Sequence, residues 1–263
     1  MLDNSRLTFN QYRIYGYDDN PLSLNGYVDF ANVDNINMSL NLVGNNFKLV
    51  ESKRAPKKVL FGNMYGKVNT RVSGSISNLS VRGRVKVLKS SNMTYIMSET
   101  PISQGDRLDD IVTFVDFKAP VDTTAADVKK TFTGLDMNMN LEVEDGAKVR
   151  AELSPDRQSY VDVQGGGALR MIITPQGVMS MTGRYTINEG EMKYTLPVIP
   201  LRTFTIRKGS YIEFMGDISN PSMNITATER TRASVSEVDG SSRSVNFDTG
   251  VRLTNTLSNM GLE

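Results

Sequence analysis

Apolar and polar side chains alternate along most of this chain with a period of two residues. Residues 36–42 read Ile-Asn-Met-Ser-Leu-Asn-Leu, residues 79–87 read Leu-Ser-Val-Arg-Gly-Arg-Val-Lys-Val, and residues 137–143 read Met-Asn-Met-Asn-Leu-Glu-Val. Successive side chains of a β-strand point to opposite faces of its sheet, so each such segment predicts a strand with one apolar and one polar face. The sequence therefore predicts an all-β protein built on a long antiparallel sheet with one apolar side.

Turn-forming residues interrupt the alternation every ~8–12 residues, which is typical of short strands joined by tight turns. These signals include Asn20-Pro21, Asn25-Gly26, Gly44-Asn45-Asn46, Asp145-Gly146, Gly165-Gly166-Gly167, Pro175-Gln176-Gly177, Asn188-Glu189-Gly190 and Asn220-Pro221. Their spacing predicts roughly 16–20 strands, which at ~4.8 Å between neighbours gives a sheet on the order of 80–95 Å across.

The stretch from residue 98 to residue 134 loses the alternation. It contains Pro101, Gly105 and a polar run at 106–110, and Thr124–Phe132 is the one segment with a helical pattern and a capping residue. We therefore divide the chain into a β-ladder at 1–97, an irregular insertion at 98–134, and a second ladder at 135–263. A loop of this length is either functional or mobile, and we favour a mobile insertion. The two ladders are expected to form one continuous sheet within a longer protein.

Composition removes most chemistries. The chain has no His and no Cys, which excludes Ser-His-Asp and Cys-His triads, thiolate zinc sites and redox pairs. Carboxylates are not spaced as in a calcium loop, and Gly165-Gly166-Gly167 is not followed by a helical pattern or a Gly-Lys-Ser/Thr motif. A net charge of +1 does not point to nucleic acid. We expect no enzyme activity, no metal and no cofactor.

Two surface patterns have alternative interpretations. Arg82, Arg84 and Lys86 form a basic outer row, which is usually a solvated face, although a partner-binding role is the alternative. Several of the 14 Met residues fall on apolar faces, where Met commonly fills a core. The alternative is a deformable surface for varied apolar ligands, because the thioether side chain adapts its shape easily. An apolar face this long needs a second sheet, a fold-over or a hydrophobic guest.

A longer motif lies between residues 183 and 233. It contains Gly-Arg-Tyr-Thr-Ile at 183–187, Gly-Glu-Met-Lys-Tyr at 190–194, Gly-Ser-Tyr-Ile-Glu-Phe-Met-Gly-Asp at 209–217, Asn-Pro at 220–221 and Ile-Thr-Ala at 225–227. This motif resembles the C-terminal domain of the TamB family, the large component of the bacterial translocation and assembly module. The chain departs from the family pattern at Ile218-Ser219, where a proline is common.

The resemblance implies an antiparallel sheet folded lengthwise into an open, taco-like groove with an apolar interior. It also implies a periplasmic location in a protein whose inner-membrane anchor lies outside this segment. The implied groove lining comprises Met137, Met139, Leu141, Val143, Val149, Leu153, Leu169, Met171, Ile173, Met179, Met181, Tyr185, Ile187, Met192, Tyr194, Leu196, Phe204, Ile206, Ile212, Phe214, Met223 and Ile225.

Three functions remain open at this point. The first is a conduit that carries phospholipid acyl chains between the inner and outer membranes and supports outer-membrane biogenesis. The second is a scaffold or chaperone that works with a TamA-type outer-membrane β-barrel protein and offers strand edges or the groove to unfolded β-proteins. The third is a purely structural β-solenoid or adhesin.

Overall fold

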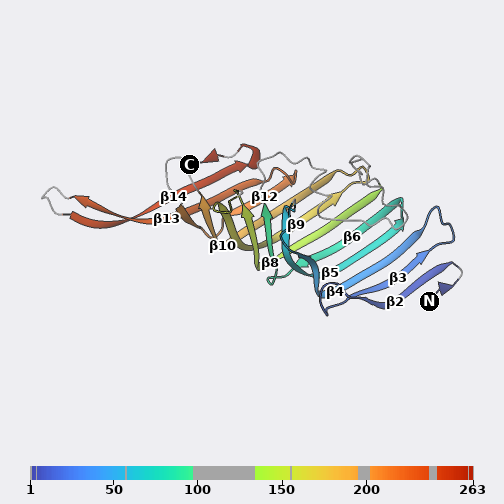
Figure 1. The fold of residues 1–263 in the computed structure, drawn as a ribbon. Coiled ribbons are helices and arrows are strands. Elements are labelled where there is room, and N and C mark those ends of the chain that lie inside the picture. Colours follow the sequence, from blue (N-terminus) through green and yellow to red (C-terminus); the bar gives the residue numbers. More distant parts are fainter. Residues whose placement is uncertain are drawn as a thin grey trace.

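The computed structural model describes residues 2–3, 5–56, 58–96, 134–154, 156–194, 202–236, 242–259 and 261–262. Over these residues, fifteen strands form one sheet, which confirms the all-β prediction (Figure 1). The strands are β1 (Leu2–Asp3), β2 (Arg6–Ile14), β3 (Leu22–Asp29), β4 (Asn37–Ser52), β5 (Leu60–Ser75), β6 (Asn78–Val87), β7 (Asn92–Ile96), β8 (Leu135–Glu152), β9 (Tyr160–Ile173), β10 (Met179–Tyr194), β11 (Arg202–Ile206), β12 (Tyr211–Gly216), β13 (Ser222–Ser236), β14 (Ser242–Thr256) and β15 (Gly261–Leu262), with a 3₁₀ turn at Leu257–Asn259.

The strands follow one another across the sheet almost in chain order. β6 and β7 share one lateral position, because both pair with β5 on one side and with β8 on the other. β11 and β12 share another position between β10 and β13. Fifteen strands in the described residues therefore occupy thirteen positions, which at ~4.8 Å spacing gives a width of about 58 Å. The described residues thus contain fewer strands than the 16–20 predicted for the whole chain.

One interface of the sheet is parallel, where the sequence predicted antiparallel pairing throughout. Leu79 lies opposite Leu135, and Ile96 lies opposite Glu152, so β6 and β7 run in the same direction as β8. Parallel neighbours require a connection that returns the chain to the starting end of the first strand. The chain after Ile96 makes that return, and the predicted insertion with its helix at Thr124–Phe132 lies in this stretch, outside the described residues.

The strands are longer than predicted, because several expected turns lie inside strands as bulges. The pairing register shifts between Gly44 and Phe47 in β4, between Val143 and Ala147 in β8, and between Ile187 and Glu189 in β10. Gly165, Gly166 and Gly167 lie within β9. A β-bulge bends its strand and increases the local twist, whereas a turn ends the strand.

These irregularities line up across the sheet and form a crease. The crease comprises the bulges of β4, β8 and β10, the glycines 165–167 of β9, and the breaks at 88–91 and 207–210 that separate β6 from β7 and β11 from β12. A Cβ on Gly167 would lie 2.0 Å from the Arg184 carbonyl oxygen, so the backbones of β9 and β10 approach too closely there for a larger residue.

A buried serine bridges each strand break in the same way. Ser91 Oγ accepts a hydrogen bond from Tyr65 N at 3.0 Å, and its hydroxyl donates to Tyr65 O at 3.2 Å. Ser210 Oγ accepts from Thr226 N at 3.1 Å and donates to Arg207 O at 2.7 Å. The two hydroxyls thus replace ladder hydrogen bonds that the broken strands cannot supply.

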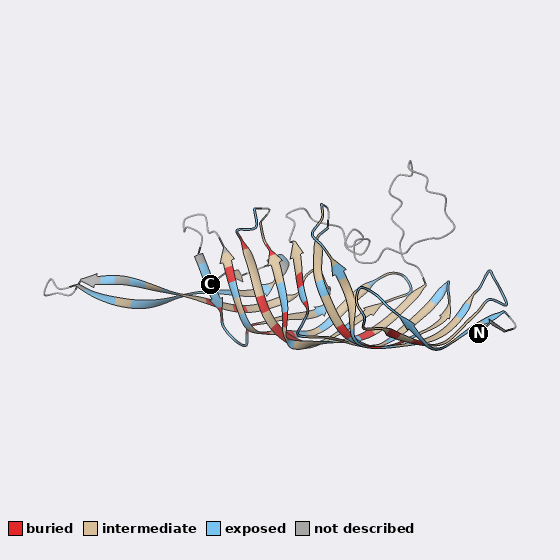
Figure 2. Cartoon of the chain, turned by 60° about the horizontal axis from the view of Figure 1, so that its bottom comes forward, coloured by how far each residue is buried: buried red, intermediate tan, exposed pale blue. Residues whose placement is uncertain are grey.

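The sheet folds at the crease toward its apolar face. Tyr185 lies on one side of the crease and Val163 and Met192 on the other, yet all three belong to one buried hydrophobic cluster, against which Ile212 also packs. The cluster continues through Ile187 at the crease, so the apolar side chains of both arms lie on the same face of the sheet. Figure 2 shows the strands curving upward from the bend, where much of the buried colour gathers. The structure thus confirms the taco-like prediction.

Candidate hydrophobic groove

Apolar side chains form rows that cross the sheet from strand to strand on its inner face. One row joins Met139, Met171 and Met181, which lie directly opposite one another on β8, β9 and β10. The next row toward the crease runs through Val85, Leu141 and Leu169 to Gly183, which pairs with Phe214. Side chains directly opposite each other on neighbouring strands point to the same face. The rows therefore make one continuous apolar lining.

A one-residue bulge keeps this lining continuous along β10. Before the bulge, odd-numbered residues such as Tyr185 and Ile187 face inward, whereas after it the inward residue is Met192. Because a register shift of one residue moves side chains to the opposite face, the bulge between Ile187 and Glu189 compensates for the change of phase in the sequence.

The structure places nineteen of the twenty-two predicted lining residues on this face. They are Met137, Met139, Leu141, Val143, Val149, Leu169, Met171, Ile173, Met179, Met181, Tyr185, Ile187, Met192, Phe204, Ile206, Ile212, Phe214, Met223 and Ile225. Leu153 lies one residue beyond the end of β8, in the turn that leads to β9. Tyr194 pairs through its backbone with Arg202, but its side chain lies outside the described residues, as does all of Leu196.

The lining extends into the N-terminal half, where the sequence prediction named no site residues. Leu22, Leu24, Val68 and Met93 are buried on this same face. The signal was present in the alternation of residues 36–42 and 64–76, but the motif that suggested a groove covers only the C-terminal strands. The inner face therefore spans the whole sheet.

The inner face is buried at the crease and more exposed on its arms. Ile187, at the crease, is 0% exposed, whereas Val149, on one arm, is 36% exposed. Most of the other predicted lining side chains are half-buried, although they belong to the apolar face. A sandwich core would bury them beneath a second layer, and no second sheet covers them in the part of the chain that the structure describes.

Two buried hydroxyls lie on the inner face. Thr70 Oγ1 and the Tyr185 hydroxyl have no hydrogen-bond partner among the described residues. Burial raises the pKa of Tyr185 to about 12, and the negative charge of Asp145 adds to this shift. Both effects favour the neutral phenol, so the floor of the groove is uncharged at this position.

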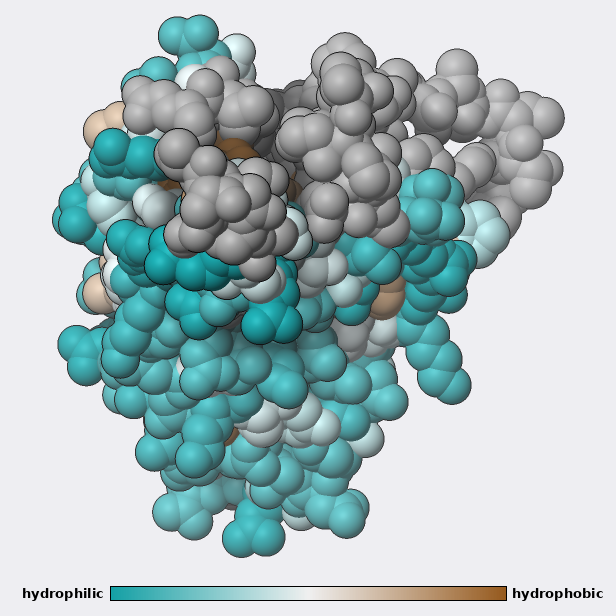
Figure 3. Space-filling view, turned by 90° about the vertical axis from the view of Figure 1, so that its left-hand side faces the viewer, coloured by the Kyte–Doolittle hydropathy of each residue, from teal (hydrophilic) through white to brown (hydrophobic). Residues whose placement is uncertain are grey.

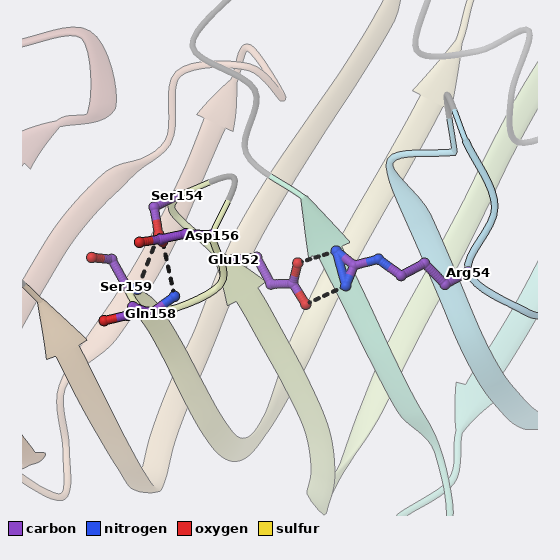
Figure 4. Close-up of polar contacts among 6 residues, drawn as sticks. All are labelled: Arg54, Glu152, Ser154, Asp156, Gln158 and Ser159. Carbon is purple, nitrogen blue, oxygen red and sulfur yellow. Dashed lines mark hydrogen bonds and ion pairs between the residues drawn. The ribbon is translucent and has the colours of Figure 1, made fainter.

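Polar contacts fix the ends of the strands near β8. Arg54, in the β4–β5 connection, forms a two-pronged ion pair with Glu152 at the end of β8, and Figure 4 shows the two groups facing each other beside β7. In the following turn Asp156 accepts hydrogen bonds from Ser154 Oγ and from Gln158 N, and both lower the pKa of Asp156. The ion pair thus joins the β4–β5 connection to the end of β8, and the hydrogen bonds of Asp156 stabilise the β8–β9 turn that follows.

The outer face is polar and carries ion pairs between neighbouring strands. Examples are Arg6 with Asp29, Lys86 with Glu142, Arg150 with Asp162, Arg184 with Glu213 and Arg230 with Asp248. Viewed from the β13–β14 end, the surface is mostly hydrophilic, and hydrophobic colour shows mainly in a recess near the top (Figure 3). One face is therefore built for water and the other for an apolar neighbour.

A single sheet folded at a crease, with an apolar inner face and a polar exterior, defines an all-β protein with a taco-like fold. The family profile of the TamB C-terminal domain matches residues 13–263, and the chain belongs to the TamB family. Members of this family span the periplasm of Gram-negative bacteria as transport and assembly modules in outer-membrane biogenesis, and they associate with a TamA-type outer-membrane partner.

Two further observations complete the comparison. No curated protein matches the chain. Among the described residues, no helix has the length and apolar character needed to cross a membrane.

Proposed function

We propose that this domain is a segment of a hydrophobic conduit that carries phospholipid between the inner and outer membranes. The observation that supports this most is the continuous apolar lining, which crosses the sheet from β2 to β14 and is half-buried along much of its course. Exposed apolar area of this extent is rare on soluble proteins and marks a binding surface. Acyl chains fit such a surface, because they are apolar, flexible and without hydrogen-bonding groups.

The shape of the lining also favours a conduit over a single pocket. Ligand pockets usually enclose most of a small ligand on all sides. Here the lining runs about 58 Å across the strands and is open along its length. The Met139–Met171–Met181 row adds side chains that adjust to moving chains at low cost.

A scaffold for outer-membrane β-proteins is the second candidate, and the unpaired strand edges favour it. β1 pairs only with Arg6 and Leu7 of β2, and β15 pairs only with Leu253 and Thr254 of β14. Much of the outer edge of β2 and of β14 therefore lacks a pairing strand within the described residues. Such edges can accept an additional strand by β-augmentation.

Mass spectrometry of the purified domain separates the two candidates. A conduit carries phospholipid through purification, whereas a scaffold captures unfolded β-strand peptides without lipid. A domain that binds neither would contradict both proposals and favour a structural role.

Met181→Asp provides the matched test of the groove. Met181 faces inward and is half-buried, so the carboxylate can bend toward water and the fold should persist. Thr182 is the next residue and is exposed on the outer face of the sheet, so Thr182→Asp adds the same charge there and serves as the control. We expect lipid binding to fall for Met181→Asp alone. Unfolding of that variant would indicate a sealed core, and a folded variant with normal lipid binding would remove this position from the path.

A further inference from the structure

The polar face contains a basic hollow between β4 and β9. It has a volume of about 1040 Å³. Six cationic side chains line it, whereas Glu142 is the one carboxylate in the lining. The cations are Lys67, Arg71, Arg82, Arg84, Lys86 and Arg170. The whole chain has a net charge of only +1, so this excess of positive charge is local. A hollow lined by one sign of charge concentrates the field and attracts the opposite charge.

The pairing register places like charges directly opposite each other in this hollow. Lys67 lies opposite Lys86, and Arg71 lies opposite Arg82. Like charges in this position destabilise an antiparallel pair. Elsewhere on the outer face, arginines lie opposite acidic partners, as Arg184 does with Glu213. The sheet therefore carries an electrostatic cost at β5 and β6 that a bound anion would offset.

Carboxylates of the protein neutralise only part of this charge. Arg82 pairs with Asp136, and Lys86 pairs with both Glu142 and Glu144; all three carboxylates lie on β8. The positive charge of Lys67 also acts on Glu144 and helps to lower the pKa of that carboxyl. Arg71 instead donates to Ser39 Oγ at 3.3 Å, and Arg170 donates to Asn138 Oδ1 at 3.0 Å. Arg84 is exposed, lies between Asn69 and Asn140, and has no acidic partner among the described residues. Arg71 and Arg84 thus keep free donors for an external acceptor.

We propose that this basic hollow binds an acidic, extended polypeptide segment of a partner protein. Cations repeat at every second residue along β6, as Arg82, Arg84 and Lys86, and alternate side chains of an extended peptide have the same ~6.8 Å repeat. The amides of Asn69, Asn138 and Asn140 add donors and acceptors for its backbone. The lining contains no aromatic side chain on which sugars or bases could stack.

The test measures binding of a fluorescent peptide of alternating Glu and Ser residues by anisotropy. We expect the double variant Arg71→Gln/Arg84→Gln to weaken binding by about tenfold or more, since each arginine offers charge-assisted hydrogen bonds to a carboxylate. The double variant Arg13→Gln/Lys208→Gln is the control, because it removes two exposed charges outside the hollow. High salt should weaken binding to the native domain.

Three outcomes would overturn the proposal. Equal weakening in the control variant would show that net charge, and not the hollow, attracts the peptide. Binding of phosphatidylglycerol vesicles that depends on Arg71 and Arg84, without binding of the peptide, would assign the hollow to a membrane surface. The hollow variant should remain as stable as the native domain or become more stable, since Arg71→Gln removes a like-charge pair. A large loss of thermal stability would show that these arginines serve the fold.

Discussion

The serines at the two strand breaks offer a quantitative test of how the crease is held. Ser91 is 2% exposed, and its Oγ is the hydrogen-bond acceptor for Tyr65 N. Ser91→Ala removes that acceptor and leaves the part-buried N–H of Tyr65 unpaired, while Tyr65 O keeps its bond from Leu88 N at 2.8 Å. An unpaired buried donor costs about 1–3 kcal/mol. Only one group loses its partner, so we expect the free energy of unfolding to fall by about 2 kcal/mol.

Urea unfolding followed by circular dichroism measures this change. With an m-value of about 3 kcal/mol/M, a loss of 2 kcal/mol lowers the midpoint by about 0.7 M. Ser90→Ala is the matched control, because Ser90 is the exposed neighbour in the same turn. Ser210→Ala should behave like Ser91→Ala, since Thr226 N loses its acceptor in the same way. If Ser91→Ala and Ser90→Ala shift the midpoint equally, the serine bridges do not hold the crease.

Three further predictions address the floor, the rim and the edges. Spectrophotometric titration should show one tyrosine that ionises near pH 12, and this titration should be absent in Tyr185→Phe. Because the pKa of Tyr185 is raised in the folded state, its contribution to the free energy of unfolding should be fully present below about pH 10 and decrease as the pH rises toward 12. If all tyrosines ionise near pH 10, the result would contradict the burial of the Tyr185 hydroxyl. Arg54→Ala leaves Glu152 buried without its partner and should lower the free energy of unfolding by about 3 kcal/mol. The double variant Arg54→Met/Glu152→Met leaves no unpaired charge and should lower the free energy of unfolding by less. A larger loss of stability in the double variant than in Arg54→Ala would refute this prediction. The open edges of β2 and β14 should give concentration-dependent association in sedimentation velocity, and a monomer at millimolar concentration would count against it.

The alternation in the sequence predicted the inner face well, because burial on one face imposes a period of two. The alternation alone assigns Met139, Met171 and Met181 to the apolar face of their strands, before it is known that these strands are neighbours. Even the bulge in β10 left a trace, since inward residues change from odd numbers at Ile187 to even numbers at Met192. That change of phase could have been interpreted as a bulge and not as a turn.

Features that depend on long-range contacts were not predicted. Gly44-Asn45-Asn46 and Asp145-Gly146 have the composition of turns, and only their alignment across the sheet shows that they bend strands. The parallel pairing of β6 with β8 depends on the return of the chain between them, for which local sequence gives no signal. Ser91 and Ser210 look like ordinary surface residues until the backbone groups of β5 and β13 are placed beside them.

Photo-crosslinking from two adjacent residues tests the central claim, that acyl chains travel on the inner face. A photoreactive phenylalanine analogue replaces Met181, which faces the groove, or Thr182, which is exposed on the outer face. The domain is irradiated in the presence of radiolabelled phospholipid and separated by denaturing electrophoresis. We predict labelled protein for the probe at position 181 and none for the probe at position 182. Equal labelling at both positions, or none at 181 in a folded domain, would contradict a lipid path along this face.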